Sequence, residues 1–168
     1  MINTVFDLMQ ETARRLTGRG NVAVRINTGG RPVKATGRYV LATTRNNRFG
    51  IPIITLYEPQ TAEQKIDSFL HECAHVKYHS DQLGNMEDLE LAEIPTDPAL
   101  KATLGRWEYE ADSTARRWMN YAKSQVETWQ QNDFESLLGA VSSARRRNIR
   151  WPPNFNFWKR KRPNCKTN

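Results

Sequence analysis

The sequence predicts an α+β fold in which a small twisted antiparallel β-sheet packs with two main helices, ahead of a basic C-terminal tail. Apolar residues at helical spacing occur before and after three short runs in which apolar residues alternate. The length of 168 residues suits one ordinary domain with its own core. We therefore expect one domain over residues 1–143 and a separate tail over residues 144–168.

The first helix is expected between Val5 and Leu16, where apolar residues recur at intervals of three and four and Gly18 ends the pattern. Asn3 or Thr4 is available as its N-cap. Three strands follow, because alternating apolar residues are separated by Gly-Gly and Arg-Asn-Asn-Arg turns. Their predicted ranges are 22–26, 38–44 and 51–57, and we interpret them as an antiparallel sheet.

A second helix should follow the strands. Thr61 and Gln64 have the spacing of a capping box, and the next apolar residues repeat at helical intervals: Ile66, Phe69, Leu70, Cys73 and Ala74. The acidic segment 80–97 has no clean period and is expected to be a surface loop.

A third helix is predicted to begin near Pro98, which suits a first helical turn, with Thr96 or Asp97 as its cap. Its apolar stripe continues to Val126. A short fourth helix is expected over residues 134–141.

Charge is distributed unevenly along the chain. Nine of the 25 Lys and Arg residues, and none of the 18 Asp and Glu residues, lie in 144–168, so residues 1–143 hold 16 basic and 18 acidic side chains. The basic pI therefore describes the tail rather than the domain. Charges in the first helix exclude a signal-peptide core and no run is apolar enough to span a bilayer, so we expect a cytoplasmic protein with no membrane partner. Cys73 and Cys165 form no disulfide framework.

The stretch FLHECAHVKYH, residues 69–79, places Glu72 between two histidines that are four residues apart. On a helix, His71 and His75 share one face, so their imidazole nitrogens can converge on one ion at about 2.0–2.1 Å. Glu72 is rotated about 100° from His71 and can reach a water beside the ion, which is the position of a general base. The pattern indicates a single catalytic zinc ion. The alternative is a pair of ordinary surface histidines.

A third histidine, His79, lies eight residues after His71, a rise of about 12 Å on a straight helix. One zinc ion cannot contact both ends of that span. We expect His79 to be exposed or to cap the helix end, with a role in substrate binding or behind the metal ligands as the alternative. Tyr78, His79 and Tyr109 are the candidates for binding substrate or stabilising an oxyanion.

A catalytic zinc ion needs a third protein ligand, and two candidates compete. Asp81 lies ten residues after His71, where some zinc proteases place a ligand after a glycine turn, but Tyr78 stands at the glycine position here. Glu108 and Asp112 share one face of the third helix. Glu108 could reach the metal while Asp112 accepts a hydrogen bond from the free nitrogen of a ligating histidine. A solvated charged face is the alternative; we favour Glu108 and keep Asp81 as the second choice.

The HExxH motif at residues 71–75 and the run EYEADSTA at residues 108–115 together resemble the ImmA/IrrE family of metallopeptidases. That family shows HExxH followed by a helix reading E-x-E-A-[N/D]-x-F-A; the matching residues are Glu108, Glu110, Ala111, Asp112 and Ala115, whereas Thr114 replaces the phenylalanine. The resemblance covers residues 3–125. It implies a zincin-like (gluzincin-like) fold, zinc ligands at His71, His75 and Glu108, and a catalytic base at Glu72. It also implies a protein partner, often a DNA-binding repressor.

The expected function is zinc-dependent hydrolysis of peptide bonds in a protein partner, with a transcriptional regulator as the candidate. An extended peptide substrate could add to an open sheet edge near residues 51–57. The tail interleaves cations and aromatic rings, which can pair with phosphates and stack on bases of flexible nucleic acid, unless the rings pack on the domain instead. The tail residues that carry this expectation are Arg145, Arg146, Arg147, Arg150, Trp151, Trp158, Lys159, Arg160, Lys161 and Arg162.

Two other functions stay open at this stage. One is a protease that acts on nucleic-acid-bound proteins, as SprT-like repair proteases do, tethered by the basic tail and with Asp81 as a metal ligand. The other is a non-catalytic protein in which the metal only supports a binding surface.

Overall fold

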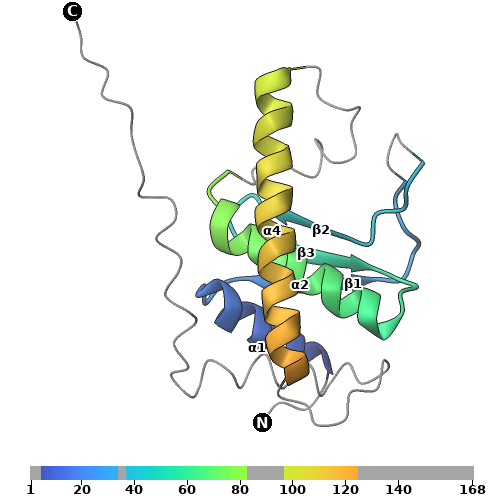
Figure 1. Ribbon diagram of the computed structural model, residues 1–168. Helices are drawn as coiled ribbons and strands as arrows, with labels where there is room; N and C mark the ends of the chain where they lie inside the picture. Colours follow the sequence, from blue (N-terminus) through green and yellow to red (C-terminus); the bar gives the residue numbers. More distant parts are fainter. Residues whose placement is uncertain (1–4, 34–36, 83–96, 125–168) are drawn as a thin grey trace, which may run out of the picture.

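The computed structural model describes residues 5–33, 37–82 and 97–124. Within these ranges the chain forms three helices and a three-stranded sheet in the order α1, β1, β2, β3, α2, α4 (Figure 1). The predicted α+β class is confirmed. The predicted fourth helix, most of the acidic loop and the whole basic tail lie outside the described residues.

Helix α1 spans Val5–Thr17, as the periodicity predicts. Gly18 ends it with a positive φ of 74°, and its amide donates to the carbonyl oxygen of Arg14 at 3.0 Å. Met9 and Ala13 are fully buried and Leu16 nearly so. This apolar face belongs to the same core as the sheet and α2.

The sheet consists of β1 (Ala23–Asn27), β2 (Ala42–Asn46) and β3 (Pro52–Tyr57) in the spatial order β1-β3-β2. Strands β2 and β3 form an antiparallel hairpin, but β1 pairs with β3 in parallel. The prediction of an antiparallel sheet is therefore wrong for β1.

Alternation of apolar residues predicts where strands lie, but it does not predict which strands pair or in which direction. Segment 28–41 leads from the end of β1 to β2 at the far edge of the sheet, and the hairpin then brings β3 back into the centre. The expected open edge near residues 51–57 is wrong for the same reason, because β3 is paired on both sides. Among the described strands, β1 and β2 are the edges.

Helix α2 spans Ala62–His79 and begins with the predicted capping box. The Gln64 amide donates to the Thr61 hydroxyl at 3.2 Å, and the Gln64 side chain accepts from the Thr61 amide at 3.1 Å. Ile66, Phe69 and Leu70 are fully buried in the core that they share with the sheet. These contacts fix α2 along one face of the sheet.

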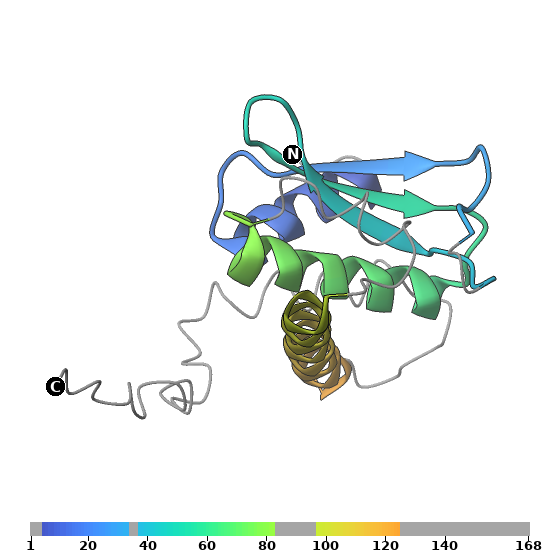
Figure 2. The same cartoon turned by 90° about the horizontal axis from the view of Figure 1, so that it is seen from above.

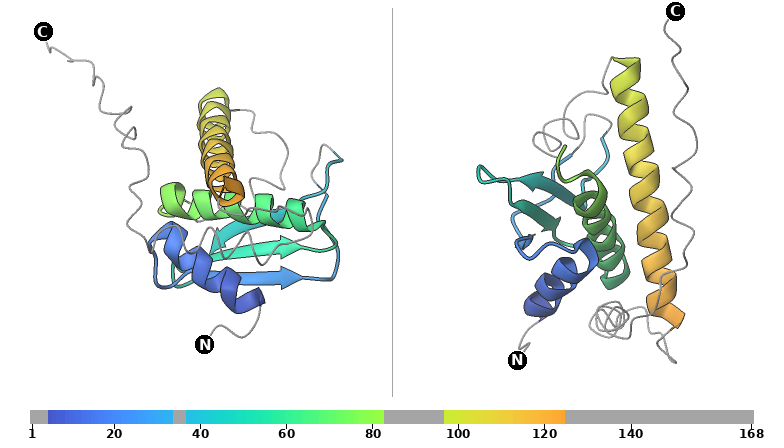
Figure 3. Two further views of the ribbon diagram at one scale, coloured as in Figure 1. Left: turned by 60° about the horizontal axis from the view of Figure 1, so that its bottom comes forward. Right: turned by 90° about the vertical axis from the view of Figure 1, so that its left-hand side faces the viewer.

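Helix α4 spans Pro98–Ser124, and Asp97 caps its start with a carboxylate that accepts from the Ala99 amide at 2.9 Å. It crosses α2 on the side away from the sheet, so the sheet, α2 and α4 form successive layers (Figures 2 and 3). Ala111 is fully buried, and Trp118 is 3% exposed. Because α2 lies between two layers, two polar residues on it, His75 and His79, are withdrawn from water.

No helix in the described ranges is both long and apolar enough to cross a lipid bilayer. The longest, α4, is interrupted by charged side chains on its outer faces, including Lys101, Arg106 and Arg117.

Candidate metal centre

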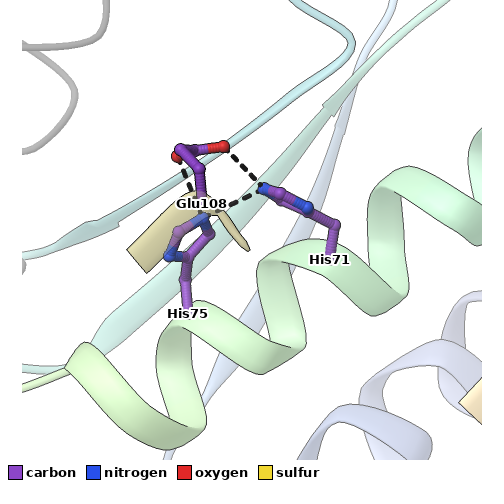
Figure 4. A group of neighbouring side chains, drawn as sticks. All are labelled: His71, His75 and Glu108. Carbon is purple, nitrogen blue, oxygen red and sulfur yellow. Dashed lines mark hydrogen bonds and ion pairs between the residues drawn. The ribbon is translucent and has the colours of Figure 1, made fainter. Parts of the chain in front are cut away.

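Three side chains meet where α4 crosses α2. His71 and His75 lie one turn apart on α2, and Glu108 reaches them from α4 (Figure 4). The two Nε2 atoms are 3.0 Å apart; the Glu108 carboxylate lies 3.3 Å from His71 Nε2 through Oε2 and 3.3 Å from His75 Nε2 through Oε1. The structure thus brings together the three residues that the sequence nominates as ligands.

The spacing of these atoms fits one tetrahedral ion. Ligand atoms that each lie about 2.0–2.1 Å from a tetrahedral zinc ion are about 3.3–3.4 Å from one another. The donor atoms of His71, His75 and Glu108 all lie within 4.8 Å of one another, and their closest separations are near that value. Two imidazoles and one carboxylate are also a ligand set that a catalytic zinc ion takes.

The nitrogen of His71 that does not face the centre is held by Asp112. Its Nδ1 lies 2.8 Å from Asp112 Oδ1. A carboxylate can only accept, so Nδ1 carries the proton. In the neutral imidazole, the lone pair then stays on Nε2, which faces His75 and Glu108. The structure therefore places Asp112 beside the histidine nitrogen for which the sequence nominates it.

His79 lies behind His75 rather than on the surface. It is 3% exposed, its Nδ1 is 3.2 Å from His75 Nδ1 and its Nε2 is 3.2 Å from Glu110 Oε2. Its ring stacks on Trp107 at 4.9 Å and 21°. Burial lowers the pKa of His79 despite the opposing effect of Glu110. The expectation of an exposed His79 is therefore wrong, because Trp107 from another helix covers the ring; a role of His79 in substrate binding stays a prediction.

The electrostatics of the centre favour a positive charge. Burial opposes protonation of His71, but the hydrogen bond to Glu108 and the charges of Glu72, Glu108 and Asp112 raise its pKa from 6.5 to about 9. Burial likewise opposes ionisation of Glu108, yet the neighbouring His71 and His75 hold its pKa well below the ordinary value in the metal-free state. Without a metal ion, the site therefore draws in a proton to balance its carboxylates.

Glu72, the nominated base, is 4% exposed and turns from α2 toward the sheet. Its Oε2 accepts a hydrogen bond of 2.6 Å from the Thr44 hydroxyl on β2, and Thr44 is itself 2% exposed. Thr44 is not among the residues predicted from the sequence, because nothing local distinguishes it from Thr43. Only the pairing of β2 beside β3 brings it under α2.

Among the described residues, the group of donor atoms that could hold an ion includes none of the remaining site candidates. Asp81 follows the end of α2 with a side chain that is 88% exposed, and its carboxylate faces Arg19 at 3.4 Å. Tyr109 is 76% exposed on α4. Tyr78 is partly buried near Thr114, and burial raises its pKa. Asp81 is therefore the weaker candidate for a ligand, whereas the substrate or oxyanion roles of Tyr78 and Tyr109 stay predictions.

An open pocket of about 630 Å³ adjoins the centre. It lies between the first turns of α2 and the C-terminal half of α4, with His71 and Asp112 in its wall beside Asp67 and Arg116. Burial raises the pKa of Asp67, Asp112 adds to this effect, and His71 and Arg116 oppose it. The pocket offers carboxylates and a cation next to His71.

Known proteins provide no relative from which a function could be inferred, so the site geometry is the basis for any functional proposal. No family model matches the chain, and no significant match was found among curated proteins or solved structures.

Proposed function

We propose that this protein is a zinc-dependent endopeptidase of the ImmA/IrrE type, with a zincin-like arrangement of its sheet and two helices. The observation that carries the proposal is the convergence of His71, His75 and Glu108 at tetrahedral donor spacing. His71 and His75 each have the other ring nitrogen engaged by a polar neighbour, so their Nε2 lone pairs are free to face one point. A general-base candidate, Glu72, is adjacent on the same helix.

A zinc ion held by these residues would supply Lewis acidity and make water a nucleophile near neutral pH. Glu72 would take the proton of the attacking water and pass it to the leaving amine. The Thr44 hydroxyl fixes one Glu72 oxygen at 2.6 Å and leaves the other oxygen for this proton transfer. Burial of the carboxylate keeps competing bulk water away.

The substrate would be an extended segment of a protein partner. Strand β2 pairs on one side only among the described strands, and it carries Thr44 beside Glu72. A peptide added along β2 would gain main-chain hydrogen bonds and pass over the base. The adjoining pocket would receive one substrate side chain beside Asp112 and Arg116. A DNA-binding regulator is the partner class that the family resemblance favours.

The geometry favours this function over a protease that uses Asp81 as a ligand. Asp81 is 88% exposed and paired with Arg19, whereas Glu108 already lies between the two histidines. Tethering to nucleic acid by the basic tail is a separate proposal, because the tail lies outside the described residues.

The first test is metal stoichiometry. Purified protein, dialysed against a weak chelator, should retain one zinc ion per chain by inductively coupled plasma mass spectrometry. Glu108→Ala should lose it, because one of three protein ligands is gone. Asp81→Ala is the matched control and should retain it. Loss in Asp81→Ala alone would overturn the ligand assignment.

The second test separates binding from catalysis. Wild type and Glu72→Gln are incubated with a peptide library derived from a bacterial proteome digest, and new termini are identified by mass spectrometry. Glu72→Gln should keep zinc but produce no termini above the chelator-treated control. Equal cleavage by Glu72→Gln and wild type would contradict the proposed mechanism.

A further inference from the structure

His79 is the one histidine that the proposed centre does not use as a ligand, yet it is among its most enclosed residues. Its ring is fixed from three sides. Nδ1 lies 3.2 Å from His75 Nδ1, Nε2 lies 3.2 Å from Glu110 Oε2, and the ring plane stacks on Trp107 at 4.9 Å. With 3% exposure, it has almost no access to water that could replace these contacts.

The hydrogen-bond directions follow from the Glu110 carboxylate, which accepts and does not donate when ionised. His79 Nε2 must therefore carry a proton to bond with it. A neutral imidazole with a proton on Nε2 has its lone pair on Nδ1, which can only accept. His75 Nδ1 must then donate to His79 at the observed 3.2 Å. The lone pair of His75 is thereby left on Nε2.

That lone pair is the one that faces the proposed metal position. His75 Nε2 lies 3.3 Å from Glu108 Oε1 and 3.0 Å from His71 Nε2. His75 is 1% exposed, so no bulk water is available to set its tautomer instead. The proton order along Glu110, His79 and His75 thus decides which nitrogen of His75 is available at the centre.

The contacts of His75 resemble those of His71, because a carboxylate of α4 helps to orient each ring. Asp112 acts on His71 directly, at 2.8 Å, whereas Glu110 acts on His75 through one intervening imidazole. Helix geometry explains the difference. Asp112 is one turn from Glu108 and shares its face, while Glu110 is one turn from Trp107 and shares the neighbouring face toward His79. Each face of α4 therefore brings a carboxylate to one histidine.

We propose that His79 and Glu110 form a positioning relay that holds His75 in the orientation and tautomer required for metal binding. The proposal deepens the zinc site of the proposed function and rests on it. His79 is a positioning residue that acts through His75, not a ligand. This role also accounts for the third histidine in the spacing His71, His75, His79, which helical rise excludes from the same ion.

The test is zinc affinity at pH 7.5, measured by competition with a chromophoric zinc chelator. His79→Phe keeps a ring that can stack on Trp107 but cannot accept from His75, and it should bind zinc about 10–100-fold more weakly. His79→Gln offers both an amide oxygen and an amide N–H, and it should bind within a few-fold of wild type. Equal affinity of wild type and His79→Phe would overturn the relay, and so would an equal loss in His79→Phe and His79→Gln.

The relay also predicts non-additivity. Glu110→Ala, at a side chain that is 38% exposed and therefore tolerant of truncation, should weaken zinc binding alone but add little in a His79→Phe background. Additive losses would contradict a relay. If His79→Phe folds poorly, Glu110→Ala can be assayed alone, and unchanged zinc affinity in that variant would contradict the relay.

A second readout does not depend on affinity. In the zinc-loaded protein, long-range ¹H–¹⁵N correlation spectra should show protonated Nδ1 for His75 and protonated Nε2 for His79. The opposite tautomer for either ring would refute the assignment. Absence of any zinc binding by wild type would instead remove the proposed function, so the two failures are distinguishable.

Discussion

In the presence of a chelator, the free energy of unfolding of this protein should depend on pH. The pH window should be set by the pKa values of His71 in the unfolded and folded states. In the folded, metal-free protein the pKa of His71 is raised from 6.5 to about 9, mainly because Glu108, Glu72 and Asp112 outweigh the cost of burial. A group whose folded pKa lies above its unfolded value stabilises the fold below the unfolded pKa. This stabilisation is lost as pH rises through the folded pKa. The free energy of unfolding should therefore fall between pH 6.5 and about 9.

The magnitude follows from linkage. Each unit of difference between the folded and unfolded pKa values corresponds to about 1.4 kcal/mol of stability. Raising the pH through this window should therefore lower the free energy of unfolding by about 3 kcal/mol. The His71 side chain is 19% exposed, but its partners Glu108 and Asp112 are 47% and 63% exposed, so solvent screening makes this value an upper bound. The change is large beside a typical total stability of about 5–15 kcal/mol.

Urea unfolding followed by circular dichroism, in EDTA and at half-unit steps from pH 6 to 9.5, measures this loss. Glu108→Gln is the informative variant, because it removes the negative charge of the group that contributes most to raising the pKa of His71. It should flatten the pH dependence. Zinc-loaded wild type should also show a flatter profile, since the ion takes the place of the proton. The same slope in Glu108→Gln and wild type would refute the reasoning.

Three further predictions concern single side chains, and a fourth concerns the charge of the C-terminal tail. Asp112→Asn should weaken zinc binding about 10–100-fold, measured by chelator competition, because Asp112 orients a histidine at 2.8 Å. Unchanged affinity would contradict this role. Thr44→Val should leave a buried carboxylate without its donor and cost about 1–3 kcal/mol in urea unfolding, with zinc stoichiometry unchanged. Phe69→Ala should cost about 3–5 kcal/mol because the side chain is fully buried, whereas Phe6→Ala, at 43% exposure, should cost much less. Deletion of residues 145–168 removes nine basic residues and should abolish binding to a single-stranded oligonucleotide in low-salt fluorescence anisotropy; persistent binding would locate the contact elsewhere.

The helices were predictable because their signals are local. The capping box at Thr61 and the proline at position 98 mark helix starts within two residues of the observed ones, and Gly18 marks an end. The pairing of β1 was not predictable in this way. Its direction depends on where segment 28–41 carries the chain, and alternation within β1 contains no information about that path.

In the candidate site, too, the features with local sequence signals were predictable, and those that depend on tertiary contacts were not. The spacing of His71 and His75 guarantees that they share a helix face, and the sequence also nominates Glu108 as their companion. The burial of His79 could not be foreseen, because it depends on Trp107 arriving from α4. The role of Thr44 could not be predicted either, because its contact with Glu72 depends on the strand order and on the position of α2 on the sheet.

The crossing of α2 and α4 has a further consequence for folding. Because the three donors come from both helices, an ion bound among them would act as a cross-link between chain segments that residues 80–97 connect. At a free zinc concentration of about 1,000 times the dissociation constant, such binding would add about 4 kcal/mol to stability. Loss of such an ion would remove the cross-link between α2 and α4, the helix that carries the buried Ala111 and Trp118. Zinc supply would thus govern the lifetime of the folded chain as well as its chemistry.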